Sequence, residues 1–382
     1  MSAGRGDGGG GKTTAGATYA ATGVDVLGLE PGLGRLVARL AETNDFPRRG
    51  RPVLPNGFFA NVLDLGHGQG LAISTDGVGT KLLVALALRR FETIAIDLIA
   101  MNVNDVLCVG AEPIALVDYV AVSSTDPVLL DQLSIGLVEG ARQARISIPG
   151  GEIAQVRELL RPHPPDGREG FDVVATAVGV VPLDRVIIGR DVVPGDVVIG
   201  LPSSGVHSNG LTLARRVLGG EGGAGYDERP DALGGRTVGE ELLRPTRIYV
   251  REVMALLDAC VAVRALAHVT GDGLLNLLRI AAREVGFVLD ALPQPQPVFD
   301  LIATRGGVAA AEMYATFNMG VGFCVVVAER DAERALGLLR EVEPAAAVLG
   351  RAVADRERKL VLPGPGLVGT GKSFRPLADA PQ

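Results

Sequence analysis

The sequence predicts a two-domain protein of the mixed α/β (α+β) class. Its 382 residues exceed what one hydrophobic core usually supports, so two domains are expected. Apolar strand-like runs alternate with amphipathic segments in both halves. A charged, proline-bearing stretch at 182–196 separates the halves. We therefore expect a tail at 1–18, domains at 19–183 and 184–355, and a second tail at 356–382.

The elements inside these domains follow from the spacing of apolar residues. Apolar runs bounded by turn residues predict strands at 114–122, 172–181 and 318–327, with another starting at 197. Amphipathic periodicity predicts helices at 93–109, 129–144, 247–260 and 329–342.

Composition excludes several classes of protein. The net charge of −7 and the lack of any basic run argue against a nucleic-acid-binding surface. No apolar run is long enough to span a membrane, and the start is glycine-rich where a signal peptide would be apolar. The three cysteines are widely spaced in apolar contexts, which is typical of reduced core residues. We expect a cytoplasmic protein.

The stretch Ser74 to Lys81 (STDGVGTK) carries the strongest chemical signal. It follows the apolar residues 71–73, which read as the end of a buried strand. Gly77 and Gly79 allow backbone N–H groups to approach an anion, and the lysine adds a charge for phosphate. Asp76 suits Mg²⁺, which prefers carboxylate and phosphate oxygens. An ordinary hairpin turn is the alternative interpretation of this stretch alone.

The predicted helix at 93–109 gathers short oxygen-bearing side chains on one face. Asp97, Met101, Asn104 and Asp105 fall within roughly 100° of one another. A solvated face is the alternative, but such a face normally carries Lys, Arg and Glu, whereas Asp and Asn are ligands for Mg²⁺. A third acidic point is Glu152, which follows a diglycine.

Two loops of the second domain have similar chemistry. Residues 202–210 (PSSGVHSNG) place hydroxyls, an amide and His207 before a predicted helix, where N–H groups and the helix dipole attract phosphate. Residues 267–273 (AHVTGDG) combine His268 with a hydroxyl, a carboxylate and two glycines. A core histidine remains the alternative for His268.

Two formal matches to the Walker A pattern, at 6–13 and 366–373, lie in the expected tails. A working phosphate loop needs a buried strand before it and a helix after it. The first match has no room for a strand, and prolines surround the second. We expect neither to bind nucleotide.

The order of these motifs resembles the phosphoribosylformylglycinamidine cyclo-ligase (AIR synthetase) family over about residues 19–350. Single motifs of the set are weak, but so many in register are specific. The motifs are Tyr19 with GVD at 23–25, STDGVGTKL at 74–82, IDLIAMNVND at 96–105, GAEP at 110–113, GGE at 150–152, SSGVHSNG at 203–210, RPTRIYV at 244–250, AHVTGDG at 267–273 and EMYATFNMGVG at 312–322.

The resemblance implies a fold, an assembly and a reaction. It implies a homodimer in which the sheets of two N-terminal domains pair into a barrel, with a C-terminal α+β domain covering the cleft. It also implies that ATP phosphorylates the formyl oxygen of a ribonucleotide substrate. The amidine nitrogen then attacks that carbon, and phosphate leaves as the imidazole ring closes.

The resemblance also implies roles for the residues picked out above. Asp76, Asp97, Asp105 and Glu152 would hold Mg²⁺. Asp76, Gly77, Gly79, Thr80, Lys81 and Asn104 would bind ATP. Ser204, His207, Ser208 and Asn209 would bind the substrate. His207, His268 and Lys81 would take part in the chemistry, with His268 the candidate for proton transfer because imidazole suits acid–base work near neutral pH.

Some positions depart from the family pattern and place the chain in a divergent branch. The usual GGFGG-type segment is replaced by Asn56 to Asn61, the usual GGG is 271–273 (GDG), and a histidine before Glu312 is replaced by Ala311. Two alternatives stay open. One is a paralogous ATP-dependent enzyme of the same superfamily acting on another carbonyl or amide, though selenophosphate synthetase is disfavoured because no cysteine lies near the N-terminus. The other is a non-catalytic regulatory homologue.

Overall fold

The computed structural model describes residues 17–23, 26–160 and 170–379. Its first half builds a six-stranded sheet in the order β1-β2-β3-β6-β4-β5. β4 and β5 run parallel, and the other neighbours are antiparallel. The strands are β1 (Arg51–Pro52), β2 (Asn61–Gly66), β3 (Gln69–Gly77), β4 (Glu112–Val122), β5 (Ser147–Gln155) and β6 (Phe171–Pro182).

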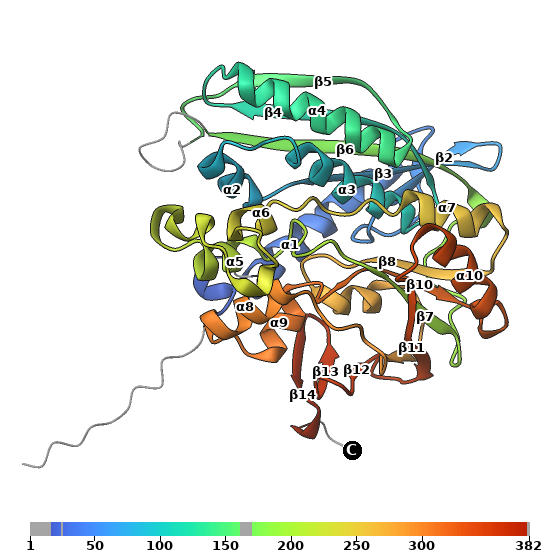
Figure 1. The fold of residues 1–382 in the computed structure, drawn as a ribbon. Helices are drawn as coiled ribbons and strands as arrows, with labels where there is room; N and C mark the ends of the chain where they lie inside the picture. The colour runs from blue at the N-terminus through green and yellow to red at the C-terminus, as the bar shows by residue number, and fades with distance from the viewer. Residues whose placement is uncertain (1–16, 24–25, 161–169, 380–382) are drawn as a thin grey trace, which may run out of the picture.

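Three helices cover one face of this sheet, as Figure 1 shows: α2 (Lys81–Leu88), α3 (Ile94–Leu107) and α4 (Pro127–Ala144). β6 alternates buried and exposed residues along its length, so one side of the sheet packs on the helices. The start of α4 is set by Asp126, whose side chain accepts the N–H of Val128 at 3.0 Å, and by proline at the first helical position.

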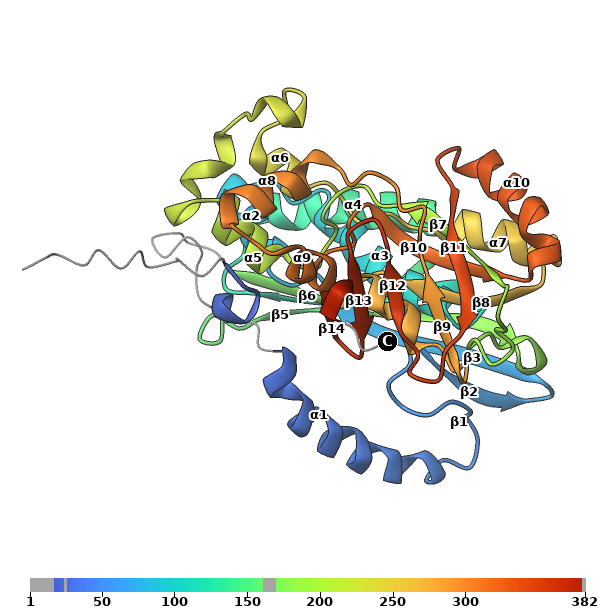
Figure 2. The same cartoon turned by 90° about the horizontal axis from the view of Figure 1, so that it is seen from below.

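The other face of the first sheet carries exposed apolar side chains. We call it the open sheet face; its apolar residues, 36–46% exposed, are Ile114, Val117, Tyr119, Val174 and Val180. A long helix, α1 (Val26–Ala41), stands on the same side of the molecule (Figure 2).

The second half builds an eight-stranded sheet in the order β14-β13-β12-β9-β11-β7-β10-β8. Every residue of β10, near one end of this order, is buried. The strands are β7 (Val197–Pro202), β8 (Val263–His268), β9 (Val285–Val288), β10 (Val321–Val327), β11 (Ala347–Ala354), β12 (Leu360–Leu362), β13 (Leu367–Thr370) and β14 (Ser373–Pro376).

The helices of the second half are α5 (Leu211–Leu218), α6 (Val238–Leu242), α7 (Val250–Asp258), α8 (Pro297–Gly306), α9 (Ala310–Thr316) and α10 (Ala332–Val342). These elements confirm the predicted mixed α/β class, and the helices and strands expected from periodicity occur within a few residues of their predicted bounds.

Helix α3 lies between the two halves of the molecule. Every residue of α3 except Asp105 is buried. Its apolar face packs on the first sheet, and its polar face meets the second domain through hydrogen bonds described below. The polar face predicted for this helix is therefore an interface and is not solvated.

The C-terminal segment expected as a tail belongs to the second sheet. β12, β13 and β14 extend that sheet because Leu360, Leu362, Leu367 and Phe374 bury their side chains on it. The Walker-like match at 366–373 is a hairpin between β13 and β14, and in the described part of the chain the three-residue 3-10 helix η8 (Leu377–Asp379) is all the helix that follows it, too short to bind phosphate. The N-terminal match lies outside the described residues, as do residues 1–16 of the expected N-terminal tail.

Candidate active site

Asp76 is held at the end of β3 by a buried amide of α3. The Asn102 side chain accepts the N–H of Asp76 at 3.0 Å and donates to its carbonyl at 3.1 Å. A side chain that both donates and accepts fixes the backbone position of its partner. Asn102 is completely buried, so this contact is shielded from water.

Asp76 and Asp105 form a pair of neighbouring carboxylates. Burial, followed by the charge of Asp105, raises the pKa of Asp76 to about 6, while Gly77 N–H and the nearby His268 act in the opposite direction. Two like charges that share a poorly solvated site repel each other unless a cation joins them. The pair is thus a ready site for a cation that prefers oxygen ligands.

His268 orients Asp105 across the domain boundary. Its Nδ1 lies 2.9 Å from Asp105 Oδ1, and its Nε2 lies 3.4 Å from the Asn104 side-chain nitrogen. If Nδ1 carries the proton and donates to the carboxylate, Nε2 is free to accept from the amide. The ring is fully buried, so neither nitrogen opens onto solvent.

Asn104 links α3 to the second domain through two hydrogen bonds. Its side chain donates to the carbonyl of Arg247 at 2.9 Å and accepts the N–H of Tyr249 at 3.0 Å. These bonds use both ends of the amide on backbone groups. The structure thus places this predicted ATP ligand in the domain interface.

Lys81 and Asp97 form an ion pair at 2.8 Å with both side chains wholly inaccessible to solvent. Lys81 also donates to the carbonyl of Arg244 at 2.5 Å. The same carboxylate oxygen of Asp97 accepts from the Thr246 N–H at 2.7 Å, from the Thr246 hydroxyl at 2.5 Å and from Ser208 at 3.1 Å. Burial lowers the pKa of Lys81, and Asp97 counteracts that effect. We call this cluster the interdomain ion pair.

The 203–210 loop uses most of its polar side chains internally. The hydroxyl of Ser204 donates to the Pro245 carbonyl at 2.5 Å, and the hydroxyl of Ser208 belongs to the interdomain ion pair. The Asn318 amide bonds the carbonyls of Gly205 and Val206 at 2.8 and 3.2 Å. The loop is therefore rigid, with its side-chain hydroxyls already satisfied.

His207 shapes this loop from the inside. Its backbone is left-handed, at φ 64°, and its Nε2 accepts the N–H of Ser204 at 3.0 Å. Burial, then the positive charges around it, lowers its pKa well below 6.5, so the ring is neutral. Its Nδ1 is buried without a partner among the described residues.

Asn209 is the side chain of this loop that remains partly exposed and lightly bonded. Within the described part of the chain, its side-chain nitrogen makes one polar contact, with Met101 Sδ at 3.9 Å. A side chain added at Gly271 would lie 3.5 Å from Asn209 Oδ1, so the two second-domain loops meet here. Met101 lies on α3 one turn before Asp105, which brings this amide to the carboxylate pair.

The glycine loop before α2 leaves room for a ligand. Gly79 is exposed and left-handed at φ 73°, and a Cβ atom added to it would meet no described atom within 4 Å. Thr80 follows, and its hydroxyl lies 2.9 Å from that of Thr212 on α5. Gly77 packs more tightly, because a Cβ added there would lie 3.0 Å from the Val173 carbonyl. The loop thus presents open backbone at the start of a helix.

Glu152 lies on the other side of the first sheet from Asp76. Gly77 pairs with Val174, Val174 pairs with Tyr119, and Tyr119 pairs with Glu152. Paired residues share a face and successive residues alternate, so Glu152 shares the open sheet face with Gly77 while Asp76 points to the helices.

The four carboxylates expected to hold Mg²⁺ therefore do not gather at one point within one chain. Asp97 precedes Asp105 by eight residues on α3, about 12 Å along the helix axis. In the described part of the chain, no group of three or more His, Cys, Asp and Glu side chains is placed to hold a metal ion. Of the four, Asp76 and Asp105 are near enough for the charge of Asp105 to raise the pKa of Asp76.

Sequence reasoning missed Asn102 and Thr246. Asn102 is an amide on an otherwise apolar side of α3. A buried polar side chain requires a hydrogen-bond partner, so its position among apolar residues could have indicated a structural contact. Thr246 lies within the 244–250 motif, but nothing in the sequence pairs it with Asp97.

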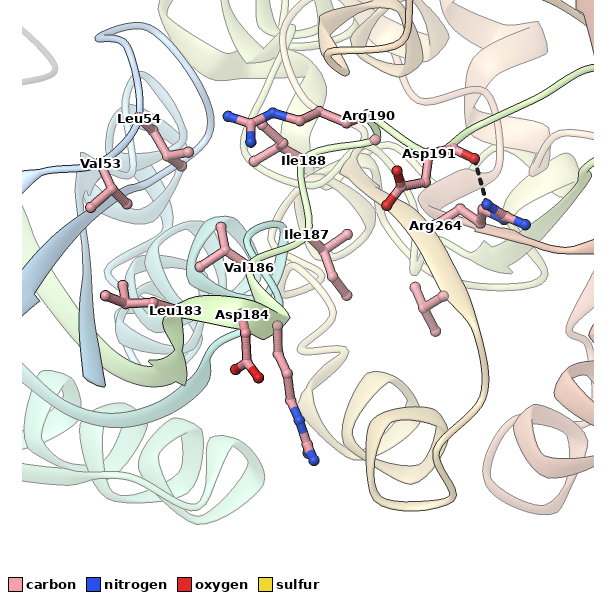
Figure 3. Close-up of a pocket in the computed structure, with 13 residues that line it drawn as sticks. Val53, Leu54, Leu183, Asp184, Val186, Ile187, Ile188, Arg190, Asp191 and Arg264 are labelled. Carbon is pink, nitrogen blue, oxygen red and sulfur yellow. Dashed lines mark hydrogen bonds between the residues drawn. The ribbon is translucent and has the colours of Figure 1, made fainter. Parts of the chain in front are cut away.

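A cavity of about 510 Å³ lies at the linker between the domains, away from the carboxylate pair. Figure 3 shows its wall, where the side chain of Arg264 donates to the backbone carbonyl of Asp191 at 2.6 Å. None of the site residues predicted from the sequence lines it. The chemistry of Asp76 and Asp105, and not cavity size, therefore locates the candidate active site.

Comparison with known proteins defines the class. Residues 59–181 match the N-terminal domain of the AIR synthase related proteins, and residues 193–363 match their C-terminal domain. The chain belongs to this family, whose two domains correspond to the two sheets described above.

Within that class, similar proteins from several archaea are named phosphoribosylformylglycinamidine cyclo-ligase. A phosphoribosylformylglycinamidine cyclo-ligase of Methanothermobacter thermautotrophicus is 47% identical over 84% of this chain and 91% of its own length. One of Methanocaldococcus jannaschii is 42% identical over 89% and 93%. The chain belongs to the phosphoribosylformylglycinamidine cyclo-ligases, ATP-dependent ligases of purine biosynthesis that form a C–N bond, which confirms the family resemblance.

Solved structures share the fold at low sequence identity. AaThiL complexed with AMPPCP and TMP has a TM-score of 0.61 and 16% identity, covering 92% of this chain and 98% of its own. The hydrogenase maturation protein HypE in complex with ATP has a TM-score of 0.56 and 20% identity, covering 91% and 95%.

The first prediction concerns the interdomain ion pair. Lys81→Met leaves the Asp97 carboxylate buried without its counter-charge, so it should lower the free energy of unfolding by about 3–5 kcal/mol in urea titrations. The control is Glu139→Gln, which breaks an exposed pair with Arg142 and should change stability by less than about 0.5 kcal/mol. A stable Lys81→Met protein that has lost its affinity for ATP would instead make Lys81 a phosphate ligand.

The second prediction follows from the raised pKa of Asp76. The carboxyl group of Asp76 ionises near pH 3.8 in the unfolded chain and near pH 6 in the folded chain. Above about pH 6 its ionised form therefore destabilises the metal-free folded state. Asp76→Asn should raise the free energy of unfolding at pH 8 by roughly 1–3 kcal/mol, with the gain shrinking as pH falls toward 4. Urea titrations without metal or nucleotide measure it.

The exposed Asp184 provides the control, since Asp184→Asn should give no such gain. A loss of stability in Asp76→Asn at pH 8 would contradict the proposed repulsion between the two carboxylates.

Proposed function

We propose that this chain closes the imidazole ring of formylglycinamidine ribonucleotide, giving aminoimidazole ribonucleotide, ADP and phosphate. The observation that carries the proposal is the Asp76–Asp105 pair at the junction of the two domains, beside the glycine loop and Asn209. Family membership supports the reaction, and the relatives at 40–47% identity support the substrate class.

The residues present fit Mg²⁺ held with a nucleotide. Mg²⁺ is commonly bound by one or two carboxylates together with phosphate oxygens and water. Asp76 and Asp105 would supply those carboxylates, and the ion would neutralise the charge of the transferred phosphoryl group. Asp97 fits poorly, because one oxygen already accepts four hydrogen bonds and the other is inaccessible.

The glycine loop would bind the phosphates of ATP. Gly79 and Thr80 offer exposed backbone at the start of α2, where the helix dipole favours an anion. Lys81, in the first turn, would act through the interdomain ion pair by fixing α2 against the second domain. This assignment changes the role that the sequence suggested for the lysine.

Two histidines position groups in this scheme. His268 would orient the Asp105 carboxylate by donating a hydrogen bond to it. His207 would hold the 203–210 loop through Ser204, and its neutral ring places no charge in the interior. Asn209 and the loop backbone would then meet the ribonucleotide.

The transferred phosphoryl group activates a poor leaving group. The formyl oxygen takes the γ-phosphoryl group of ATP, the amidine nitrogen bonds to the formyl carbon, and phosphate departs with that oxygen. The site would contribute by alignment and by dry surroundings, because the residues of α3 around Asp105 are buried.

We further propose a homodimer formed through the open sheet face. Its exposed apolar residues lie together on one face of β4 and β6, and contiguous patches of this kind mark interaction sites. Glu152 lies on that face and would serve the dimer interface or a site that two copies share.

A cytoplasmic location suits the chain. The described cysteines form no disulfide, and Cys108 and Cys324 are buried, as expected in a reducing compartment. No helix among the described residues has the length and apolar character needed to cross a bilayer.

The third prediction tests the carboxylate pair. Asp105→Asn should lower kcat for Mg²⁺-dependent ATP turnover at least about 100-fold, because it removes a charge that would hold the metal beside the reacting phosphate. ADP release coupled to ring closure measures it, and circular dichroism checks the fold. Asp184→Asn, in an exposed carboxylate outside the cleft, should retain wild-type turnover. Wild-type kcat in folded Asp105→Asn would remove Asp105 from the metal site.

The fourth prediction tests the second-domain loop. Asn209→Ala should raise KM for the ribonucleotide by roughly 10-fold, as expected for one lost hydrogen bond to a charged group, and leave KM for ATP unchanged. Ser208→Ala is the contrasting variant: its hydroxyl bonds Asp97 and Thr246, so it should lower stability first. Equal rises in both KM values for Asn209→Ala would assign the side chain to the nucleotide or to the fold.

A further inference from the structure

Tyr19 and Glu312 belong to two family motifs that take no part in the function proposed above. The structure brings them together, because the backbone N–H of Tyr19 donates to the Glu312 carboxylate at 2.7 Å although the two are 293 positions apart in the chain. A hydrogen bond to a carboxylate is stronger than one between neutral groups. The segment around Tyr19 therefore lies on the second domain, although it precedes the first domain in the sequence.

Two further hydrogen bonds hold this segment, residues 17–23, which we call the N-terminal strap. Ala17 N–H donates to the carbonyl of Gly306, the last residue of α8, at 3.0 Å. The side chain of Arg216 on α5 donates to the carbonyl of Ala21 at 2.8 Å. Together with the contact to α9, these bonds fix the backbone of the strap to three helices of the second domain.

The strap places the Tyr19 hydroxyl at the start of α5. The Tyr19 ring is half-buried and packs on the hydrophobic core. Burial raises the pKa of its hydroxyl, and a hydrogen bond from the Gly210 backbone acts in the opposite direction. Gly210 immediately precedes α5 and has no side chain with which to cap it. The phenol oxygen thus serves one of the backbone N–H groups that the start of a helix leaves unsatisfied.

The position of Gly210 determines the position of Asn209, the amide proposed to meet the ribonucleotide. Gly210 directly follows Asn209 and is left-handed at φ 75°. A Cβ atom added to Gly210 would overlap the Phe317 ring, so the turn is already packed against the core on that side. The phenol hydroxyl and the Phe317 ring therefore hold this turn together, one through a hydrogen bond and the other through packing.

We propose that Tyr19 is a substrate-positioning residue whose hydroxyl holds the turn at 209–210 so that the Asn209 amide faces the ribonucleotide. This inference rests on the ring-closing function proposed above and adds to it a residue far from the 203–210 loop in the sequence. Without the hydroxyl, the Asn209 amide is free to adopt more orientations. Binding of the ribonucleotide must then order it, which weakens that binding. The glycine loop that would bind ATP belongs to the first domain and is not affected.

The experiment removes the hydroxyl and keeps the ring. Tyr19→Phe should raise KM for formylglycinamidine ribonucleotide by roughly 5–10-fold, as expected for one lost hydrogen bond, and should change kcat and KM for ATP by less than about twofold. The matched control is Tyr226→Phe, because Tyr226 packs against Gly219 at the other end of α5. This control should leave both KM values unchanged.

A double variant separates positioning from a general loss of structure. If Tyr19 acts through Asn209, adding Tyr19→Phe to Asn209→Ala should raise KM for the ribonucleotide by less than about twofold, since the amide that it positions is already absent. Effects of the two substitutions that multiply would overturn the inference, because Tyr19 would then act independently of Asn209.

Hydrogen exchange measures the contact itself. The Gly210 amide should exchange at least about 5-fold faster in Tyr19→Phe than in the wild-type protein, because its acceptor is gone. An equal exchange rate, or an unchanged KM for the ribonucleotide in Tyr19→Phe, would overturn the role of Tyr19 alone. A wild-type chain without ribonucleotide-dependent ATP turnover would overturn the proposed function and this inference together.

Discussion

The structure depends on the buried ion pair of Lys81 and Asp97. Both groups belong to the first domain, but second-domain groups complete their hydrogen bonds: the Arg244 carbonyl, Thr246 and Ser208. A charge removed from water is tolerated only when its partners are placed accurately. The two domains must therefore dock in one register, and that register brings His268 to Asp105 and Asn209 to Met101.

Local chemistry was predictable from the sequence because it depends on neighbours in the chain. The helix carrying Asp97 and Asp105 and the loop bearing His207 occur where their motifs indicated, whereas β3 continues to Gly77, past the strand end expected at 73, and His268 is the last residue of β8. Asp76 and Asp105 also come together, since a strand end and the next long helix pack closely in such a fold.

Contacts between residues far apart in the chain could not be predicted from local sequence patterns. A sequence shows that Lys81 and Ser208 are polar, but their burial and their shared bond to Asp97 depend on how the domains dock. The side on which Glu152 lies depends on strand register, where one residue reverses the face. Strands β12 to β14 are short apolar segments between glycines and prolines, so the sequence alone resembles a tail. They form strands because they pair with the edge of the second sheet at β9.

The hydrogen bond between His268 and Asp105 joins groups from different domains. In the function proposed above, the glycine loop and the carboxylates would face a nucleotide from the first domain, and Asn209 would face the other substrate from the second. A shift of one domain by a fraction of an ångström would alter the orientation of Asp105 and the repulsion felt by Asp76. The two ligands are thus coupled through the hydrogen bond between His268 and Asp105. If one ligand strengthens this bond and thereby favours binding of the other, the second ligand favours binding of the first by the same free energy.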